Sequence, residues 1–391
     1  MKFSIGWPIL RVVCPIVLLG IPLLAIPGQG QTRAYVTNTS GTVSVINTMT
    51  NTIVATISVG IFPSGVAITP DGTRAYVANI VNSISVIDTA TNAVVATIPS
   101  GQFPTGLAIT PDGTRVYVVN QFLTNGHNTV SVIETKTNTI VATIPVGLGP
   151  IAVSITPDGT RAYVPNQQDF NISVIDTATN TVVTTIPVNG TAGVAITPDG
   201  TRAYVTSPGG GTVSVIDIAT NNVVETIFLG ANQNPFGVAI TPDGSRAYVT
   251  INFPNIVSVI DTFTNTIVGT IPVGLGPTGV AITRDGTRAY VTNNDSNTVS
   301  VITTASNIVT ATVGVGIGPN AIAISPGIGP PTKKDQCKDG GWRIFTIPRK
   351  FKNQGDCVSF VNIGRDLKAI DMRSGRAGEY SGFPYRSNAM W

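Results

Sequence analysis

The segment Pro63-Ser-Gly-Val-Ala-Ile-Thr-Pro-Asp-Gly-Thr-Arg-Ala-Tyr-Val77 contains the pattern that decides the fold. Its last four residues follow the pattern Arg-(Ala/Val)-Tyr-Val, which recurs along the chain at intervals of 41 to 46 residues. The copies begin at Arg33, Arg74, Arg115, Arg161, Arg202, Arg246 and Arg288. A spacing in this range is typical of an array built from one repeated supersecondary unit.

One copy of the repeat predicts four short β-strands. Runs rich in β-branched residues cover 65–69, 74–77, 83–87 and 94–98, and we call them strands A, B, C and D. The A–B turn contains Asp71-Gly72 and the C–D turn contains Asp88 to Asn92, which are residue types that favour tight turns. Strand A begins seven times, at Gly65, Gly106, Ala152, Gly193, Gly237, Gly279 and Ala321.

Seven four-stranded units predict an all-β, seven-bladed β-propeller, since propellers usually carry four to eight such blades. The array begins with strands B, C and D, over residues 33–59, and ends with a lone strand A over 321–325. We therefore expect the last strand A to pair with the first strand B and to close the ring within one blade. Such closure would hide strand edges from foreign strands.

The first 30 residues resemble a targeting segment. Lys2 and Arg11 precede an apolar run over 12–26, and Gly28 and Gly30 supply a small-x-small cleavage site. An uncleaved anchor is the alternative, although the run is shorter than the ~20 residues that a spanning helix needs. We expect a signal peptide over 1–30, no transmembrane span after its cleavage, and a secreted or cell-surface protein.

The end of the chain differs in charge and cysteine content. The net charge is −5 over 31–332 and +6 over 333–391, which places a boundary near Pro330-Pro331. Removal of the signal peptide leaves Cys337 and Cys357, a pair that predicts one disulfide in an exported chain. We expect a propeller over 31–326, a linker over 327–334, a disulfide-closed appendage over 335–364, and a tail over 365–391 whose order the sequence does not decide.

The charge pattern also bears on partners. Only 11% of the residues are charged, against roughly 25% in typical soluble domains, which argues against binding of nucleic acid. The basic tail is explained either by a solvated extension, which is more common, or by contact with an anionic surface.

The repeat closely resembles the YVTN family of β-propeller repeats over residues 32–326. Tyr-Val-Thr-Asn occurs intact at 35–38 and 290–293, flanked by Thr-Pro-Asp-Gly-Thr-Arg and Ser-Val-Ile-Asp-Thr-Ala-Thr-Asn blocks. The resemblance implies an exported or surface-layer protein of bacteria or archaea, mostly without assigned chemistry. The segment 335–360 is similar to a short cysteine-paired module at the C-termini of exported bacterial proteins.

The D–A and B–C loops vary between repeats, whereas the A–B and C–D turns hardly do. Variation on a fixed scaffold is where function is usually carried. Six phenylalanines, interleaved with Asn and Gln, are expected on the face that these loops form, and such a face suits a saccharide, a peptide or a protein partner. The alternative is that each ring folds back over its own loop. The six are Phe62, Phe103, Phe122, Phe170, Phe236 and Phe253.

An enzyme is the competing hypothesis, because the repeat class is similar to lactonase-like and lyase-like propellers. The candidate groups at the channel mouth are His127, Asp169 and Asp295, of which the two acids come from non-adjacent blades. Strand A offers no carboxylates for a metal, and all three tryptophans lie outside the array, so we expect neither a metal nor another cofactor.

Repetition itself suggests a structural role for other polar residues, since a reaction needs asymmetry. The recurring acids at the end of strand C are expected to hold turns, and the repeated Arg and Tyr to brace blades. These acids are Asp88, Glu134, Asp176, Asp217 and Asp261. The sequence thus favours a non-enzymatic binding or interaction scaffold that acts through one loop face.

Overall fold

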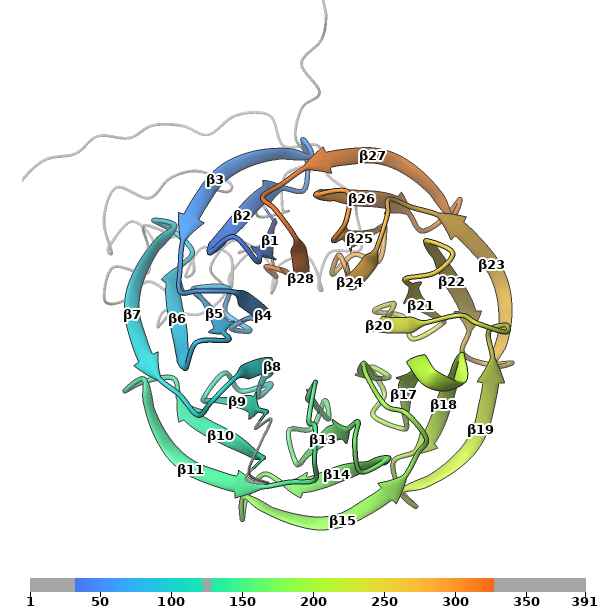
Figure 1. Cartoon of the computed structure of the whole chain (residues 1–391), viewed down its shortest axis with the longest axis horizontal. Coiled ribbons are helices and arrows are strands. Elements are labelled where there is room, and N and C mark those ends of the chain that lie inside the picture. Colours follow the sequence, from blue (N-terminus) through green and yellow to red (C-terminus); the bar gives the residue numbers. More distant parts are fainter. Residues whose placement is uncertain (1–31, 122–127, 327–391) are drawn as a thin grey trace, which may run out of the picture.

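The computed structural model describes residues 32–121 and 128–326, which form a ring of seven four-stranded antiparallel sheets around a central axis (Figure 1). The all-β, seven-bladed propeller predicted from the repeats is confirmed. Residues 1–30 and 327–391 lie outside the described part of the chain, and so do Phe122, His127, Cys337 and Cys357.

Each blade contributes one strand to each of four concentric positions, and Figure 1 shows strand A nearest the axis. The strands in position A are β4 (Pro63–Ile68), β8 (Pro104–Ile109), β12 (Ser154–Ile155), β16 (Val194–Ile196), β20 (Pro235–Ile240), β24 (Pro277–Ile282) and β28 (Pro319–Ile324). Position B holds β1 (Arg33–Asn38), β5 (Arg74–Asn79), β9 (Arg115–Asn120), β13 (Arg161–Asn166), β17 (Arg202–Ser207), β21 (Arg246–Ile251) and β25 (Arg288–Asn293). Position C holds β2 (Thr42–Asn47), β6 (Ser83–Asp88), β10 (Thr129–Glu134), β14 (Asn171–Asp176), β18 (Thr212–Asp217), β22 (Ile256–Asp261) and β26 (Thr298–Thr303). The outermost position D holds β3 (Thr52–Ser58), β7 (Ala93–Pro99), β11 (Thr139–Pro145), β15 (Thr181–Pro187), β19 (Asn222–Phe228), β23 (Thr266–Pro272) and β27 (Ile308–Gly314).

Strand A is shorter than the sequence predicts in the fourth blade, where β12 has two residues, and in the fifth, where β16 has three. In the fourth blade β12 pairs with β13 through only two residues. Four residues earlier in the chain than Ser154, Pro150 forms an isolated bridge with Asn166. Pro165 occupies β13 where β17, β21 and β25 carry Thr206, Thr250 and Thr292. Proline has no N–H to donate, so the ladder towards strand A is interrupted at this residue.

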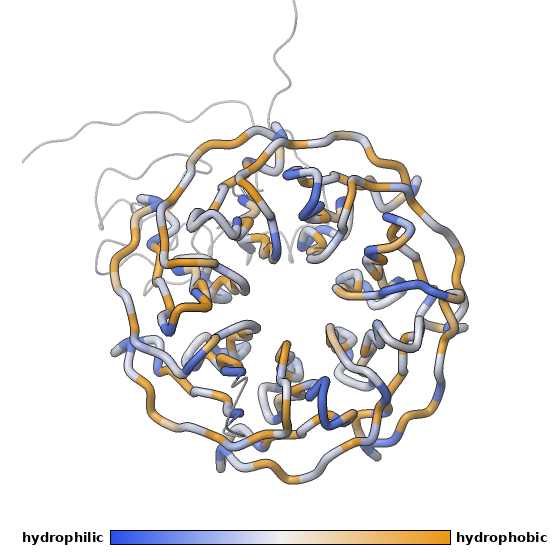
Figure 2. The backbone as a smooth tube through the Cα atoms, in the orientation of Figure 1, coloured by the Kyte–Doolittle hydropathy of each residue, from blue (hydrophilic) through white to orange (hydrophobic). Residues whose placement is uncertain are grey.

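The hydrophobic core lies between neighbouring blades. Tyr117 and Val132 of the third blade, for example, pack in one buried cluster with Ala162 and Val164 of the fourth. Strands B and C carry apolar residues on both faces because each inner sheet is covered on both sides, and Figure 2 shows the resulting apolar segments inside the ring. Burial of each Val or Ile side chain contributes about 1.5–3 kcal/mol relative to exposure.

One blade is built from both ends of the array. In it β28 pairs with β1, with Tyr35 opposite Ala323 and Ala34 opposite Ile324, and the sheet order is β28-β1-β2-β3. The Tyr290 hydroxyl of the seventh blade donates to Asn51 Oδ1 of this blade at 2.8 Å. Contacts of this kind therefore run from the last complete blade to the first.

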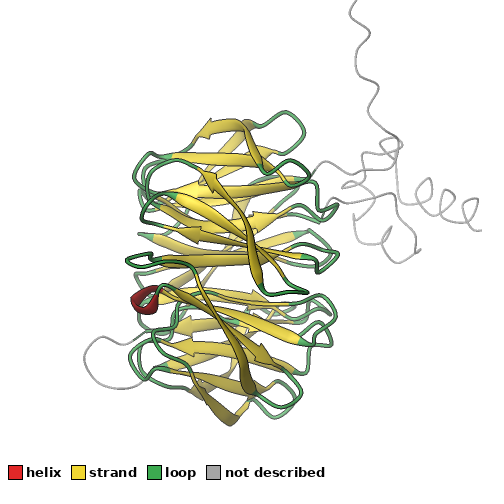
Figure 3. Cartoon of the chain, turned by 90° about the vertical axis from the view of Figure 1, so that its right-hand side faces the viewer, coloured by secondary structure: helices red, strands yellow, loops and turns green. Residues whose placement is uncertain are grey.

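The loops of the ring are divided between two faces, which the side view separates (Figure 3). The D–A and B–C connections form what we call the loop face, and the A–B and C–D connections form the turn face. A single turn of 3₁₀-helix, η1 (Pro208–Gly210), lies on the loop face. Within the described ranges, no helix is long and apolar enough to cross a membrane.

Candidate binding face

Charged side chains are segregated between the two faces. Of the nine Lys and Arg residues in the described ranges, seven begin strand B and two, Lys136 and Arg284, lie in a C–D and an A–B turn, so all nine are at the turn face. Of the fourteen carboxylates, only Asp169 and Asp295 lie in loops of the loop face. The loop face, as far as it is described, therefore carries no cation and two anions.

The loop face also exposes large apolar side chains. Eight of them project from its loops, and Ile317 is the most exposed at 68%. The eight are Ile61, Phe62, Val81, Leu148, Phe170, Phe253, Leu275 and Ile317. Exposed apolar residues are ordinary when scattered, but eight of them on a face with no described cation make that face a candidate for interaction.

Three of the six predicted phenylalanines meet the expectation of exposure. Phe62, Phe170 and Phe253 are 53%, 56% and 65% exposed, so more than half of each residue is open to solvent. Phe103 is half-buried. Phe122 lies outside the described residues.

Phe236 requires a correction, because it belongs to strand β20 and not to the D–A loop. Pro235 pairs with Ile251, and the Gly237 N–H donates to Thr250 Oγ1 at 2.8 Å. Phe236 itself is half-buried, and its carbonyl accepts a bond of 2.6 Å from Thr206 Oγ1 of the preceding blade. The residue is thus part of the packing between blades, near the inner rim of the loop face.

Phe62 and Phe103 adopt left-handed backbone conformations, with φ of 51° and 46°. Each accepts, through its carbonyl, a bond from the N–H that follows the next strand B. Gly149, Gly276 and Gly318 accept the equivalent bond in other blades, with φ of 63–69°. A bulky residue in this region costs about 1–2 kcal/mol relative to its ordinary conformations, whereas glycine does not pay that penalty.

Phe170 has the same left-handed backbone conformation, in a B–C loop. Its φ is 54°, and its carbonyl accepts a bond from Val188 N–H. The equivalent carbonyls belong to Gly41, Asn82, Asn128, Gly211, Asn255 and Asn297. Asn and Gly are the residues that tolerate left-handed conformations best. The sequence gives no direct signal for this feature, although alignment of the repeats would have shown Phe where Gly or Asn is usual.

A ring of neutral side chains that differ from blade to blade surrounds the inner rim of the loop face. Each member precedes the Gly or Ala that the repeats place in strand A, and the ring consists of Ser64, Thr105, Ile151, Ala192, Phe236, Thr278 and Asn320. Several are tied to the next blade: Thr105 Oγ1 donates to the Ile151 carbonyl at 3.2 Å, and Thr278 Oγ1 to the Asn320 carbonyl at 2.9 Å. Sequence reasoning missed this ring because its members share no chemistry.

The two acids proposed for an enzyme are not brought together. Asp169 lies in the fourth blade and Asp295 in the seventh, on opposite sides of the ring in Figure 1. Asp169 Oδ2 accepts the Leu148 N–H at 2.8 Å, and a Cβ on Gly276 would lie 2.6 Å from Asp295 Oδ2. Each carboxylate therefore packs over the neighbouring D–A loop. Over the described ranges, no group of three or more His, Cys, Asp or Glu could hold a metal.

The repeated acids do hold turns, as predicted. Asp88 Oδ1 accepts bonds from the N–H groups of Ala90 and Thr91 at 3.1 and 2.9 Å, and Asp176 and Asp261 make the same pair of bonds in their own turns. In Asp176 and Asp261 these bonds stabilise the ionised form. In Asp176 and Asp261 the bond from the backbone N–H three residues on makes the largest contribution to a lowered pKa.

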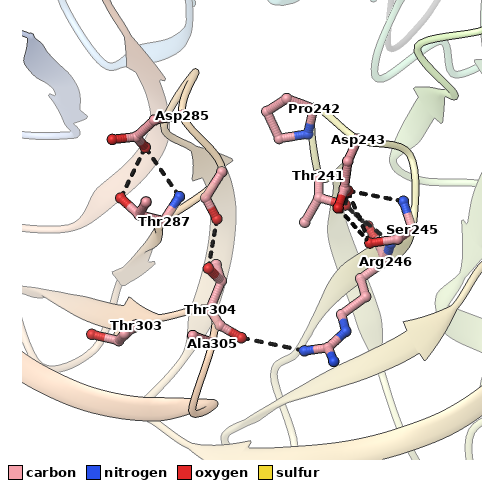
Figure 4. A pocket seen from close by; sticks show the side chains of 11 residues that line it. Thr241, Pro242, Asp243, Ser245, Arg246, Asp285, Thr287, Thr303, Thr304 and Ala305 are labelled. Carbon is pink, nitrogen blue, oxygen red and sulfur yellow. Dashed lines mark hydrogen bonds between the residues drawn. The ribbon is translucent and has the colours of Figure 1, made fainter. Parts of the chain in front are cut away.

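The turn face contains clefts between neighbouring blades (Figure 4). One of about 780 Å³ is lined by Asp243, Arg246, Asp285 and Thr304, and a second of about 390 Å³ lies one blade away beside Asp199 and Phe263. Asp243 Oδ1 accepts from Thr241 Oγ1 at 2.5 Å, and this bond chiefly lowers the Asp243 pKa. Arg246 Nη1 donates to the Thr304 carbonyl at 3.3 Å. Because equivalent residues recur in most blades, these clefts follow from blade packing.

The repeated arginines and tyrosines brace the blades, as predicted. Five of the seven arginines, Arg33, Arg115, Arg202, Arg246 and Arg288, donate to a threonine carbonyl in the C–D turn of the next blade. All seven tyrosine hydroxyls donate to an asparagine of that turn at 2.6–3.2 Å. These arginines and all seven tyrosine hydroxyls thus bond to the next blade and do not supply reactive groups at the channel.

Comparison with known proteins supports the fold and leaves the activity open. No family model matches the chain, and no curated protein matches it. Hydrazine synthase from Kuenenia stuttgartiensis is similar over 74% of this chain and 99% of that chain, with 26% identity and a TM-score of 0.65. A candidate 6-phosphogluconolactonase from Bacteroides uniformis is similar over 76% and 99%, with 18% identity and a TM-score of 0.64. The dihydro-heme d1 dehydrogenase NirN matches over 75% of each chain, with 17% identity and a TM-score of 0.56. Propellers with such different titles share the scaffold, so function must be argued from the site.

Proposed function

We propose that the protein is an exported or cell-surface propeller that acts as a non-enzymatic binding scaffold and captures an uncharged partner on its loop face. One observation carries this proposal. The loop face gathers eight exposed apolar side chains and, in the described ranges, no lysine or arginine, while the turn face holds all nine cations.

The apolar and charged groups of the loop face determine which kind of partner gains binding free energy there. Burial of apolar area contributes about 25 cal/mol per Å², so a partner that covers Phe62, Leu275 and Ile317 gains binding free energy there. A phosphate-rich or carboxylate-rich partner would find no described cation on the same face, and Asp169 and Asp295 would repel it. An acidic partner is therefore disfavoured, and because both carboxylates pack over D–A loops, we expect a neutral partner to gain more than a basic one.

The location of the protein is part of the proposal and rests on the sequence. The apolar run over 12–26 with its small-residue cleavage site supports export, and Cys337 and Cys357 would form a disulfide in that compartment. The resemblance of the repeats to the YVTN family supports a surface role. The closure of the ring through β28 and β1 would suit exposure to an extracellular environment, because it leaves no strand A unpaired.

The alternative is a lactonase-like or lyase-like enzyme with its site at the channel mouth. It is supported only by the similarity of the repeat class to such propellers. The candidate lactonase, at 18% identity, shows a shared fold and adds no support for the activity. Asp169 and Asp295 lie on opposite sides of the ring and pack over loops, and His127 lies outside the described residues. No described group of residues favours the enzyme.

Surface variants of the full chain test the proposed function. We would immobilise the purified protein and measure its retention of neutral and acidic polysaccharides and of neutral peptides, at low and high salt. Replacement of Ile61, Leu275 and Ile317 by Ser should weaken capture at least tenfold, because three exposed apolar contacts are lost.

The matched control carries Met49→Ser and Phe263→Ser, which remove exposed apolar residues from the turn face. This control should bind as the wild type does. Binding that is lost in the control, or that falls steeply with salt, would contradict capture of a neutral partner by the loop face. Turnover of a lactone, lost when Asp169 and Asp295 are changed to Asn, would support the enzyme.

A further inference from the structure

Three phenylalanines of the loop face occupy positions where the fold requires a left-handed backbone, which phenylalanine rarely adopts. Phe62, Phe103 and Phe170 have φ between 46° and 54°, at positions where other blades carry Gly or Asn. We call these three residues the aromatic arc. Residues with strained backbone conformations occur preferentially at functional sites.

Within the described part of the chain, burial of these rings does little to offset the backbone strain. Phe62 and Phe170 leave more than half of their surface in solvent, and Phe103 is only half-buried. The carbonyl bond that each one accepts is made equally well by Gly149 or Asn297 in another blade. The fold thus gains little from these rings, which leaves an external ligand as the reason for their presence.

The arc lies on one side of the loop face. Phe62 is in the loop between β3 and β4, Phe103 in the next D–A loop along the ring, and Phe170 in the B–C loop of the fourth blade (Figure 1). Exposed amides accompany the rings in the same loops: Gln102 precedes Phe103, and Gln168 lies two residues before Phe170. The rings are therefore distributed over three successive blades and do not form one compact cluster.

We propose that the aromatic arc binds a neutral saccharide chain. This inference rests on the proposed function, of which it specifies the ligand class. The flat faces of the rings stack on the C–H faces of sugar rings, and side-chain amides donate to and accept from hydroxyl groups. An extended polymer can reach platforms in three blades, whereas the central hot spot of a protein interface needs its aromatic anchors clustered. The missing cations disfavour acidic sugars.

The experiment exchanges each ring for the residue of the equivalent blades. Phe62→Gly, Phe103→Gly and Phe170→Asn, made singly and together in the full chain, are titrated calorimetrically with laminarin, dextran and mannan, and with alginate as the acidic counterpart. We expect the triple variant to lose at least tenfold in affinity for a neutral polysaccharide. Its melting temperature should equal or exceed that of the wild type, and Phe170→Asn should raise it by about 2 °C because the strain is relieved.

The control variant Met49→Ser with Phe263→Ser removes exposed apolar groups from the turn face, and we expect it to bind saccharide as the wild type does. Full saccharide binding by the triple arc variant would overturn the arc while leaving capture by the loop face intact. Loss of binding in the turn-face control would instead contradict capture by the loop face. Failure of the wild type to bind any neutral polysaccharide, binding of alginate alone, or a lower melting temperature in all three single variants would also overturn the inference. Binding lost in the arc variant alone, with stability kept, supports it.

Discussion

The tyrosine of each repeat links its blade to the next. Tyr204 OH, for example, donates to Asn265 Oδ1 at 2.6 Å, and that asparagine has a left-handed φ of 54°. Asparagine therefore serves twice at this position, because it tolerates the turn conformation and also accepts the bond. The same pair joins the seventh blade to the first, through Tyr290 and Asn51.

Tyr290→Phe should lower the free energy of unfolding by about 1 kcal/mol. The change removes a buried hydroxyl bond and keeps the packing of the ring, so the cost is close to that of one hydrogen bond. Urea unfolding measures it. Tyr204→Phe is the control in the middle of the array, and a much larger loss in Tyr290→Phe would show that the bond across the junction has a special weight.

Alkaline pH should destabilise the protein through the same tyrosines. Burial raises the pKa of all seven phenols above the usual value near 10. The unfolded chain therefore loses these protons at lower pH than the folded chain does. The stabilisation is fully present below pH 10 and is lost as pH rises through the folded pKa values. Melting temperatures between pH 8 and 11.5 test this, and a flat profile would contradict it.

At the scale of elements, glycines of the D–A loops allow close contact with the end of strand B. A Cβ on Gly274 would lie 2.7 Å from Asn293 Cγ and 2.6 Å from Ser296 Oγ. Asn293 meanwhile donates through Nδ2 to Thr298 Oγ1 and Ser300 Oγ, at 3.0 and 2.9 Å. The loop and the hairpin β25–β26 are thereby packed on each other at the loop face.

Gly274→Ala should therefore destabilise the protein by about 1–3 kcal/mol, since the added methyl group forces Asn293 to move. Gly314→Ala is a matched control at the end of β27, where a Cβ meets no atom within 4 Å. Thermal or urea unfolding compares the two. Equal effects would show that the contact with Asn293 relaxes without cost.

Strands and turns were largely predictable because one strong pattern occurs seven times. The alternation of β-branched runs with Asp-Gly and Thr-Asn turns located strand B, as in Arg74–Asn79, nearly to the residue. The shortening of β12 and β16 was not predicted, because their residues continue the same repeat pattern, and the missing N–H of Pro165 bears only on the first of them. The left-handed φ of Phe62 was also hidden, since phenylalanine in a loop carries no conformational signal of its own.

At the scale of the whole molecule, the ring separates mechanical and recognition roles. Charged and turn-forming residues on the turn face hold neighbouring blades through bonds such as that of Arg246 to Thr304. The D–A and B–C loops of the loop face carry none of the repeated Arg and Tyr bonds, and they vary from blade to blade. This division follows from strand direction: every strand B begins at the turn face, so the arginine that begins it lies there in all seven repeats.

The split blade is the place where the ring should be most sensitive. β28 is joined to β1 by pairing alone, whereas β24 is also joined to β25 by a short A–B turn. Ala323 in β28 and Ala281 in β24 are equivalent, since each lies opposite the tyrosine of its strand B. Proline at either position removes an N–H from the ladder and therefore destabilises the pairing of strand A with strand B.

Ala323→Pro should therefore lower the unfolding midpoint more than Ala281→Pro does. In Ala281→Pro the A–B turn keeps β24 close to β25. In Ala323→Pro no such turn holds β28, so β28 can leave β1 and expose the edge of the sheet. Limited proteolysis should show the same order, with cleavage near β28 in Ala323→Pro. Equal midpoints and equal cleavage in the two variants would mean that the pairing of β28 with β1 adds no more to stability than an ordinary blade contact.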